Sequence, residues 1–377
     1  MKKRIGNKTI VIFSAYIPPH LGGIERYIDN LSRKLVEKGI KVVIVTSNLN
    51  NGVSRENVNG IEILRLPIYN VFKNRYPIIK KNKKYREVMS NLDKYDIDTI
   101  IVNTRFHLTS HVGAKYGKKR GVPVYLIEHG SNYVTLNNKF IDFFANRYED
   151  FLTNRIRKKI KAFYGVSDAC GQWLKHFGID ASGTWYNSID IDQKLPIRKK
   201  HEGINFMYAG RIIKQKGVEN ILNSFIKLED KFKDIKLYIA GDGPELGEYK
   251  KKFSNNNTIK FLGKLDYNTL LEYYAKTDVF LYPPLWPEGL PTSILEAGLM
   301  KCAVIGTRQG GICEVIINRK NGILVDNDMN SLYLAMKELL SDKNLIKNYS
   351  NEINKTINEK FSWDSTANKI LGDIDER

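Results

Sequence analysis

Short apolar runs alternate with longer segments of helical period along almost the whole chain. TIVIFS (9–14) and KVVIVTS (41–47) are the first two runs, and both are rich in β-branched residues. The segment between them has apolar residues at the spacing of one helix face, namely Ile24, Ile28, Leu31 and Leu35. Gly39 stands where that helix should end. The same alternation predicts further strands near 61–67, 98–103, 122–130 and 162–167.

The alternation begins again near residue 200. PIRKKHEG separates the two series and resembles a linker, and INFMYAG (204–210) opens the second series. The later strands are expected near 235–241, 258–263, 278–284, 303–307 and 322–325, with helical patterns from 328 to the end. Strands that alternate with helices predict doubly wound parallel sheets with right-handed crossovers. The expected α/β fold has two Rossmann-like domains facing a central cleft, over 1–195 and 196–362.

Length and composition restrict the kinds of protein that this chain can be. The chain has 377 residues, which is long for one core. No apolar run approaches the roughly eighteen residues of a membrane span. The basic start followed by apolar residues 9–14 resembles a signal peptide, but the run is short and no small-residue cleavage site follows, so a first strand is expected. Three widely spaced cysteines suit a reducing cytosol rather than a disulfide scaffold.

The net charge of +19 is partly clustered. KNRYPIIKKNKKYR (73–86) and RIRKKIK (155–161) contain no acidic residue. Such clusters fit a solvated surface, a nucleic acid or an anionic membrane, where each basic residue contributes about 1 kcal/mol. Charge alone does not choose among these partners.

Glycines and cations stand at the predicted carboxyl ends of strands, where doubly wound sheets bind ligands. Gly22 and Gly23 open the first helix, and its free N–H groups attract anions. Arg211 and Lys216 follow the strand at 204–210, where two cations suit a diphosphate. Gly243 lies in a tight turn after the next strand.

PEGLPTSILEAG (287–298) places Glu288 in a loop and Glu296 in a helix. Pro291 suits the first position of that helix. Paired carboxylates can hydrolyse a glycosidic bond. Beside a helix start that receives a diphosphate, they are better suited to accept hydrogen bonds from sugar hydroxyls. The expected ligand is therefore a nucleoside-diphosphate sugar.

As an ordered set these motifs resemble the retaining glycosyltransferases of the GT-B fold, family four, also called glycosyl transferases group 1, of the bacterial polysaccharide-biosynthesis type. The matching segments cover nearly the whole chain, and they include PPHLGGIER, IEHG, YGVSDAC, YNSIDID, FMYAGRIIKQKG, LYIAGDGPE, LYPPLWPEGLPTSILEAG, TRQGGICEVI and FSWDSTANKIL.

This resemblance implies roles for individual residues on the donor side. Arg211 and Lys216 would bind the donor diphosphate, with help from N–H groups around Gly22 and Gly23. Glu296 would accept hydrogen bonds from the ribose. The sugar hydroxyls would be held by the segment that contains Glu288, Gly289, Leu290 and Pro291.

The resemblance also implies an acceptor-binding N-terminal domain (1–195), a nucleotide-sugar-binding C-terminal domain (196–362) and a C-terminal helix (363–377) that crosses back to the N-terminal domain. His129 and Glu288 would be the catalytic residues, with His129 near the reacting carbon. Ser167, Asn187 and Gly243 would line the cleft. No metal and no cofactor would be needed, because cations and helix ends stabilise the departing diphosphate. Retention would follow front-face attack, in which the leaving phosphate oxygen takes the acceptor proton.

Three departures from the family pattern stand out. Ser188 follows Asn187 where the family has glycine, so a turn with positive φ would be strained there. Lys301 and Ala303 replace a small residue and a proline. The lysine excess of the N-terminal domain fits a polyprenyl-diphosphate-linked acceptor. The protein is then expected in the cytoplasm, peripheral on the inner face of the plasma membrane.

Other hypotheses remain open. Asp-x-Asp occurs at 96–98, 190–192 and 373–375, in unrelated contexts that indicate chance rather than a metal site. A nucleotide-sugar epimerase on the same fold would act without an acceptor. A non-enzymatic basic module would bind nucleic acid or anionic glycan by stacking on aromatics such as Tyr76 and Tyr85. That module leaves the strand-end cations and the two glutamates without a role, so no nucleic acid is expected.

Overall fold

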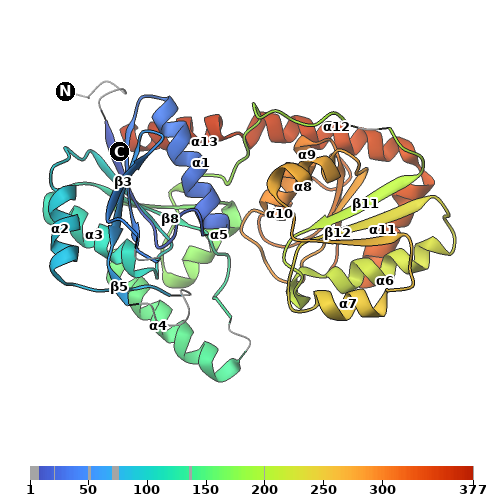
Figure 1. The fold of residues 1–377 in the computed structure, drawn as a ribbon, viewed down its shortest axis with the longest axis horizontal. Helices are drawn as coiled ribbons and strands as arrows, with labels where there is room; N and C mark the ends of the chain where they lie inside the picture. Colours follow the sequence, from blue (N-terminus) through green and yellow to red (C-terminus); the bar gives the residue numbers. More distant parts are fainter. Residues whose placement is uncertain are drawn as a thin grey trace. The chain divides into compact units, whose positions relative to one another are not determined.

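The computed structural model describes residues 8–20, 22–49, 52–69, 76–135, 138–198 and 200–376. The chain divides into two compact units (Figure 1). Unit 1 comprises Met1–Asn187 and Trp363–Arg377, and unit 2 comprises Ser188–Ser362. The division falls after Asn187 rather than at 195, because Ile189 already donates its backbone N–H to the Phe361 carbonyl of unit 2 at 2.9 Å.

An eight-stranded sheet forms the centre of unit 1, in the order β10-β9-β8-β7-β1-β2-β4-β3. Its strands are β1 (Thr9–Phe13), β2 (Lys41–Ser47), β3 (Arg55–Val58), β4 (Ile61–Leu66), β7 (Thr99–Asn103), β8 (Val124–Glu128), β9 (Ala162–Gly165) and β10 (Gly183–Thr184). All neighbouring strands pair in parallel except β3 and β4, which are antiparallel. The apolar runs therefore form a parallel sheet, as the alternation predicted.

Helices cover both faces of this sheet, so β1 is buried along its whole length. Ile10 and Ile12 face one core, while Val11 and Phe13 face the other. The helices of unit 1 are α1 (Gly23–Glu37), α2 (Lys83–Leu92), α3 (Leu108–Arg120), α4 (Lys139–Arg157), α5 (Asp168–Leu174) and α13 (Trp363–Glu376). Helix α1 ends as predicted, since Gly39 has a φ of 79°.

Helix α13 belongs to the core of unit 1. The indole N–H of Trp185 donates to Asp373 at 2.7 Å, and Trp363 packs its ring against Tyr27. The segment directly after β10 and the last helix of the chain are thereby joined within one unit.

Unit 2 is built on a six-stranded parallel sheet with the order β13-β12-β11-β14-β15-β16. Its strands are β11 (Ile204–Ala209), β12 (Ile235–Ala240), β13 (Ile259–Gly263), β14 (Val279–Tyr282), β15 (Ala303–Thr307) and β16 (Ile323–Val325). Its helices are α6 (Val218–Glu229), α7 (Leu246–Lys252), α8 (Tyr267–Tyr274), α9 (Thr292–Leu299), α10 (Ile312–Val315), α11 (Met329–Ser341) and α12 (Lys343–Lys360). The order reverses next to β11, so the loops after β11 and β14 lie at the switch point where ligands bind.

Some local predictions were wrong or incomplete. The antiparallel strand β3 and the small hairpin β5 (Ile68–Tyr69) with β6 (Ile78–Ile79) were not predicted, because their short sequences carry no long apolar run. Within the described ranges the non-glycine residues with positive φ are Asn59, Thr104, Lys301 and Arg319, so the strain predicted at Ser188 is absent. Residues 73–75 of the first basic cluster lie outside the described residues.

Candidate functional site

The carboxyl edge of the unit 2 sheet carries most of the predicted donor-binding residues. Arg211 follows β11, Lys216 ends a short 3₁₀ turn before α6, and Glu288 lies in the loop between β14 and α9. Close backbone packing fixes these loops. A Cβ atom added to Gly243 would lie 2.0 Å from the Ile212 carbonyl oxygen, so the turn after β12 can pack against the Arg211 segment only with glycine there.

Lys216 and Glu288 are brought into direct contact. The Lys216 ammonium donates to Glu288 Oε1 at 2.6 Å and to the Tyr282 hydroxyl at 2.9 Å. The two charged side chains are 16% and 24% exposed, so this ion pair is only partly screened by water. Burial first, and then the Glu288 charge, raise the pKa of Tyr282, which therefore stays a neutral hydroxyl. The pair places a cation and a carboxylate side by side at the sheet edge.

Backbone contacts hold the loop that contains Glu288 in place. Gly311 donates its N–H to the Glu288 carbonyl at 3.0 Å, and Gly310 adopts a φ of 51° beneath it. A Cβ atom on Gly310 would lie 2.0 Å from that carbonyl oxygen, so glycine is required there. The Glu288 carboxylate is thus positioned by two glycines from the loop after β15.

Arg211 differs from Lys216 in its surroundings. Its side chain is exposed, and among the described residues it has no hydrogen bond or ion pair. Its carbonyl accepts from the Tyr208 hydroxyl at 2.8 Å, which anchors the backbone while the guanidinium stays in solvent. An anchored arginine with an unengaged fork of donors is suited to a phosphate group.

Glu296 is buried within α9. Its Oε2 atom accepts from the Tyr274 hydroxyl at 3.2 Å. Burial, followed by the Glu296 charge, raises the pKa of Tyr274, so the phenol keeps the proton that it donates. Glu296 is thus a buried carboxylate in the helix that follows the Glu288 loop, and a tyrosine hydroxyl anchors it.

The start of α9 differs from its prediction in one respect. Pro291 precedes the helix with ψ of 120°, and Thr292 is the first helical residue. Proline was expected at the first helical position, but its extended ψ places it at the cap instead, where no side chain caps the helix. Leu290 is buried, whereas Gly289 and Glu288 are half-buried. The uncapped N–H groups of Thr292 and Ser293 fit the predicted anion cradle.

In unit 1, His129 directly follows β8 and is half-buried. Its Nε2 atom lies 2.9 Å from Asn103 Oδ1, while the Asn103 amide N–H donates to the Phe13 carbonyl. Because Oδ1 can only accept, the imidazole carries its proton on Nε2. Burial lowers the pKa of His129 to about 3, so the ring is neutral at physiological pH.

A buried ionic cluster supports the His129 loop. Glu128 Oε1 accepts the backbone N–H groups of His129 and Gly130, at 3.1 and 3.0 Å. Its other oxygen lies 2.8 Å from the Arg105 guanidinium, which also binds Glu149 of α4. Burial raises the pKa of Glu149 to about 7 despite the Arg105 charge. Sequence reasoning missed this cluster, although Glu128 is part of the IEHG segment.

Gly22 and Gly23 lie at the start of α1, but a carboxylate already stands there. A Cβ atom on Gly22 would lie 2.2 Å from Glu25 Oε2, and Glu25 Oε1 lies 2.8 Å from His20 Nδ1. The space around Gly23 is open. Glu25 therefore occupies part of the position expected for an anion, and a diphosphate would have to displace it.

Ser167 follows β9 and Asn187 follows β10, but both have structural partners. The Ser167 hydroxyl caps α5 by accepting from Cys170 N–H at 3.1 Å, and Asn187 N–H donates to the Val166 carbonyl. Both side chains are buried. Helix capping alone accounts for a serine at position 167.

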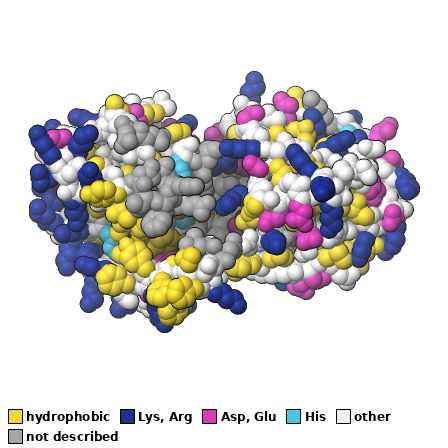
Figure 2. Space-filling model, turned by 60° about the horizontal axis from the view of Figure 1, so that its bottom comes forward, with side chains coloured by type: hydrophobic (Ala, Val, Ile, Leu, Met, Phe, Trp, Pro, Cys, Tyr) yellow, Lys and Arg dark blue, Asp and Glu magenta, His cyan; other side chains and the backbone are white. Residues whose placement is uncertain are grey.

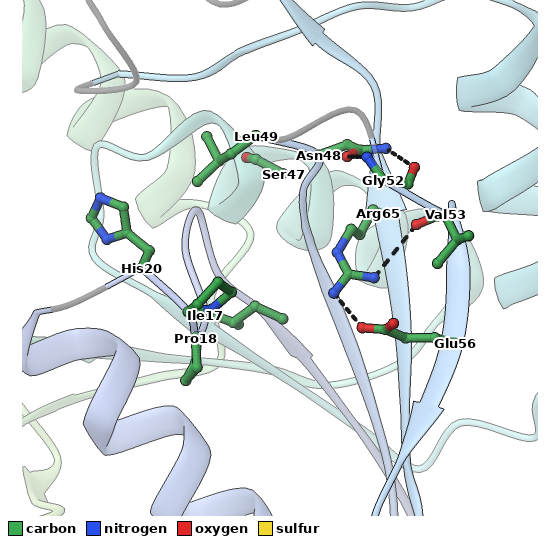
Figure 3. A pocket seen from close by; sticks show the side chains of 11 residues that line it. Ile17, Pro18, His20, Ser47, Asn48, Leu49, Gly52, Val53, Glu56 and Arg65 are labelled. Atoms are coloured by element: carbon green, nitrogen blue, oxygen red, sulfur yellow. Dashed lines mark hydrogen bonds and ion pairs between the residues drawn. The ribbon is translucent and has the colours of Figure 1, made fainter.

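A cavity of about 340 Å³ opens at the carboxyl ends of β1, β2 and β4 in unit 1 (Figure 3). Ile17, Pro18 and His20 form one wall. Arg65 forms the other, where its guanidinium bridges Glu56 and the Val53 carbonyl. The remaining lining residues are Pro19, Ser47, Asn48, Leu49 and Gly52. A mixed apolar and charged lining is typical of a small-molecule site.

The described residues contain no group of three or more His, Cys, Asp or Glu side chains arranged to hold a metal ion. The Asp-x-Asp segments have structural partners instead. Asp98 accepts from Thr9 N–H at 2.8 Å, and Asp190 accepts from Asp192 N–H at 3.1 Å. In the described part of the chain, no helix has both the length and the apolar character needed to cross a membrane.

Two family models match the chain in tandem. Glycosyltransferase Family 4 matches residues 21–193, and Glycosyl transferases group 1 matches residues 190–356. The chain belongs to the group 1 glycosyltransferases.

Relatives and solved structures agree with this membership. The transferase is similar to an uncharacterized glycosyltransferase of Methanocaldococcus jannaschii, with 29% identity over 94% of this chain and 95% of the relative. It is 20% identical to the phosphatidylinositol N-acetylglucosaminyltransferase GPI3 subunit of Saccharomyces cerevisiae, over 96% of this chain and 81% of the relative.

Two solved structures share its fold. Sucrose-phosphate synthase from Thermosynechococcus elongatus has a TM-score of 0.81 at 17% identity, over 98% of this chain and 99% of that one. Anabaena Alr3699/HepE, solved in complex with UDP-glucose, has a TM-score of 0.73 at 15% identity, over 98% and 100%. The glycosyltransferase therefore has the GT-B fold with two Rossmann-like domains, as predicted.

Proposed function

We propose that this glycosyltransferase moves a hexose-type sugar from a nucleoside-diphosphate sugar to a hydroxyl of a glycan or lipid-linked sugar, with retention and without a metal, in cell-surface polysaccharide synthesis. The observation that carries the donor site is the Lys216–Glu288 contact of 2.6 Å at the switch point of the unit 2 sheet. Ligands of doubly wound sheets bind at the switch point. A diphosphate sugar needs a cation there for its phosphates and an acceptor for its hydroxyls.

The donor-binding residues contact different parts of the nucleoside-diphosphate sugar. The exposed Arg211 guanidinium and the Lys216 ammonium neutralise the diphosphate, and the uncapped start of α9 adds N–H donors. Glu296 accepts from the ribose, and Glu288 accepts from the transferred sugar. A nucleotide sugar as donor is supported by the UDP-glucose complex of the Anabaena protein of the same fold.

Charge stabilisation at the leaving group requires no metal in this scheme. As the bond to the anomeric carbon breaks, negative charge develops on the diphosphate, next to Arg211 and Lys216. Fixed cations in a partly dehydrated site are worth more than cations in water. The acceptor proton then passes to the leaving phosphate oxygen on the same face of the sugar.

His129 acts as a neutral hydrogen-bonding group beside the reacting carbon. A pKa near 3 makes it a poor proton acceptor, so proton transfer is not its role. Its Nε2–H is committed to Asn103, and Nδ1 is left as an acceptor for a sugar hydroxyl.

The acceptor is assigned to unit 1. The cavity at the ends of β1, β2 and β4 would take the acceptor sugar, with Arg65 and His20 on its walls. A lipid-linked acceptor, such as a polyprenyl-diphosphate-linked sugar, is supported by the similarity to the yeast GPI3 subunit, whose name places phosphatidylinositol in its reaction. The protein would then lie peripherally on the inner face of the plasma membrane.

A thermal-shift screen against UDP-, GDP- and ADP-sugars tests the donor. A ligand at a hundred times its Kd adds about 2.7 kcal/mol to stability, which moves the melting temperature by several degrees. The anomeric proton of the product, followed by NMR with the active donor, then tests retention. A product with inverted configuration, or a changed sugar formed without any acceptor, would contradict the proposal, the latter in favour of an epimerase.

A further inference from the structure

Helix α4 packs on unit 1 through its second half only. Its buried residues are Glu149, Leu152, Thr153 and Ile156, and none lies between 139 and 148. In Figure 1 the first half of α4 extends beyond the body of unit 1. This projecting half contributes nothing to either core of the unit.

The outward face of α4 is nevertheless aromatic. Phe140, Phe144 and Phe151 are 73%, 56% and 52% exposed, and Phe143 is 56% exposed. Every exposed phenylalanine in the described part of the chain lies on this helix. Positions 140, 144 and 151 have the spacing of one helical stripe, opposite the face that carries Leu152 and Ile156. Such a stripe in contact with water is unfavourable, so it indicates an interaction surface.

Cations stand among these aromatic rings. The Arg147 guanidinium lies 5.5 Å from the centre of the Phe143 ring, and that of Arg155 lies 5.3 Å from the centre of Phe151. The acidic residues of the helix also have partners: Asp142 accepts from Thr135, and Asp150 accepts from Tyr133 and lies 3.8 Å from the Arg147 guanidinium.

A denser group of cations gathers at the carboxyl end of α4. Burial and the charges of Lys118, Arg155, Lys115 and Lys158 together lower the pKa of Lys159. These lysines come from the end of α4 and from α3, so the basic cluster at 155–161 is larger in space than in sequence. Figure 2 shows hydrophobic side chains gathered on unit 1, with Lys and Arg side chains along its neighbouring edge. Uncompensated positive charge beside an apolar stripe calls for an anionic partner with an apolar layer.

The other basic cluster adjoins the same helix. The ring of Tyr76 contacts that of Tyr148 on α4, with centroids 6.2 Å apart. Lys81, Lys83 and Lys84, which follow Tyr76 in the chain, are exposed. Tyr76 of the first cluster therefore contacts α4, and the second cluster continues from the carboxyl end of this helix.

We propose that the outward face of α4, formed by Phe140, Phe143, Phe144, Phe151, Arg147 and Arg155, docks the protein on a lipid bilayer with anionic headgroups. Phenylalanines enter the interfacial layer, while arginines and lysines bind the headgroups. A second copy of the chain is disfavoured because it would bring two positive surfaces together. The inference rests on the lipid-linked acceptor of the proposed function, but its test measures binding rather than sugar transfer, so the two can fail separately.

Co-sedimentation of the full chain with vesicles tests this surface. Vesicles of phosphatidylcholine alone are compared with an equimolar mixture of phosphatidylcholine and phosphatidylglycerol. The wild-type protein should bind the mixed vesicles and lose binding at high salt. Phe140→Ser with Phe144→Ser should lower the partition coefficient on the order of tenfold or more. Arg155→Gln with Lys158→Gln should lower it several-fold, and only on anionic vesicles.

Matched controls come from unit 2. Ile317 and Leu334 are also exposed apolar residues, and Lys250 and Lys251 are exposed lysines of α7. The paired changes to serine or glutamine at these sites should leave vesicle binding unaltered. All substituted side chains are exposed, so melting temperature and donor-induced shift should match the wild type in every variant.

A fluorophore attached to the cysteine of Phe144→Cys reports whether this position enters the apolar layer of the bilayer. Cys170 and Cys302 are buried, so Cys313→Ser removes the exposed native thiol. Anionic vesicles should shift the emission of this probe to the blue, and should leave a probe on Leu334→Cys unchanged.

Three results would overturn the proposal. One is equal binding to neutral and anionic vesicles. Another is wild-type binding by the phenylalanine variant. The third is a wild-type dimer in light scattering that this variant abolishes, without any vesicle binding, which would assign the face to a second copy.

Discussion

Replacing Lys216 by methionine removes the cation that contacts Glu288 while keeping most of the apolar length of the side chain. At 2.6 Å and an effective dielectric constant of about 20, the gross attraction of this pair is about 6 kcal/mol. Desolvation of two ions offsets much of that attraction. Breaking a fully buried pair costs about 3–5 kcal/mol and an exposed pair under about 1 kcal/mol. Since these side chains are 16% and 24% exposed, Lys216→Met should lower the free energy of unfolding by about 1–3 kcal/mol.

Activity should fall further than stability. Loss of a charge-stabilising donor at a leaving group typically costs about 10²- to 10³-fold in rate. Pairing Lys216→Met with Glu288→Gln separates the two effects, because the second change removes the stranded carboxylate. The double variant should recover most of the stability and none of the activity.

Urea unfolding and steady-state kinetics with the donor found by thermal shift provide the assay. Lys216→Met with undiminished transfer would show that the ion pair is only structural. Recovery of transfer in the double variant would refute the reasoning as well, because no cation would then be needed at that position.

Other predictions concern the remaining site residues. Glu296→Gln should weaken donor binding about tenfold by calorimetry, because a neutral amide accepts a hydrogen bond from a hydroxyl less strongly. Glu288→Gln should mainly lower kcat. Equal effects of the two changes on donor binding would contradict the assignment of the ribose to Glu296 and of the transferred sugar to Glu288. Asn103→Ala should lower kcat about tenfold or more with donor affinity unchanged, because His129 loses the acceptor for its Nε2–H, and unchanged kcat would remove His129 from the reacting centre. Burial lowers the pKa of His111 to about 4, below the roughly 6.5 of the unfolded chain, so the native state takes up fewer protons and loses stability as pH falls from about 6.5 to 4. As pH falls over that range, urea titrations should therefore show His111→Gln losing less free energy of unfolding than the wild type. A difference between the two proteins that does not change with pH would contradict this prediction.

The core strands could be predicted because parallel strands buried on both faces are almost wholly apolar. TIVIF is apolar after its first residue, and KVVIVTS contains the unbroken apolar run VVIV. The edge strand β3, of sequence RENV, is exposed and polar, and only its pairing with β4 makes it a strand. Prediction failed there because the information lies in a partner strand rather than in the segment itself.

The site residues show the same contrast between information within a segment and information in a distant partner. Arg211 and Lys216 could be selected because they lie in the segment after β11, and Glu288 and Glu296 because they lie in the loop and helix after β14. Their partners could not, since Tyr282 lies 66 positions along the chain from Lys216 and no local pattern links them. The anion cradle expected at Gly22 overlooked Glu25, because a helical first turn brings that carboxylate back over the glycine.

The most direct test compares two cations of one turn in unit 2. Arg211 and Lys214 are both exposed, and only Arg211 is assigned to the donor diphosphate. Titration calorimetry with the active nucleotide sugar should show affinity lowered about tenfold or more in Arg211→Ala, because a charge-assisted phosphate contact is lost, and unchanged in Lys214→Ala. Equal affinity in wild type and Arg211→Ala would contradict the donor site, and with it the proposed function.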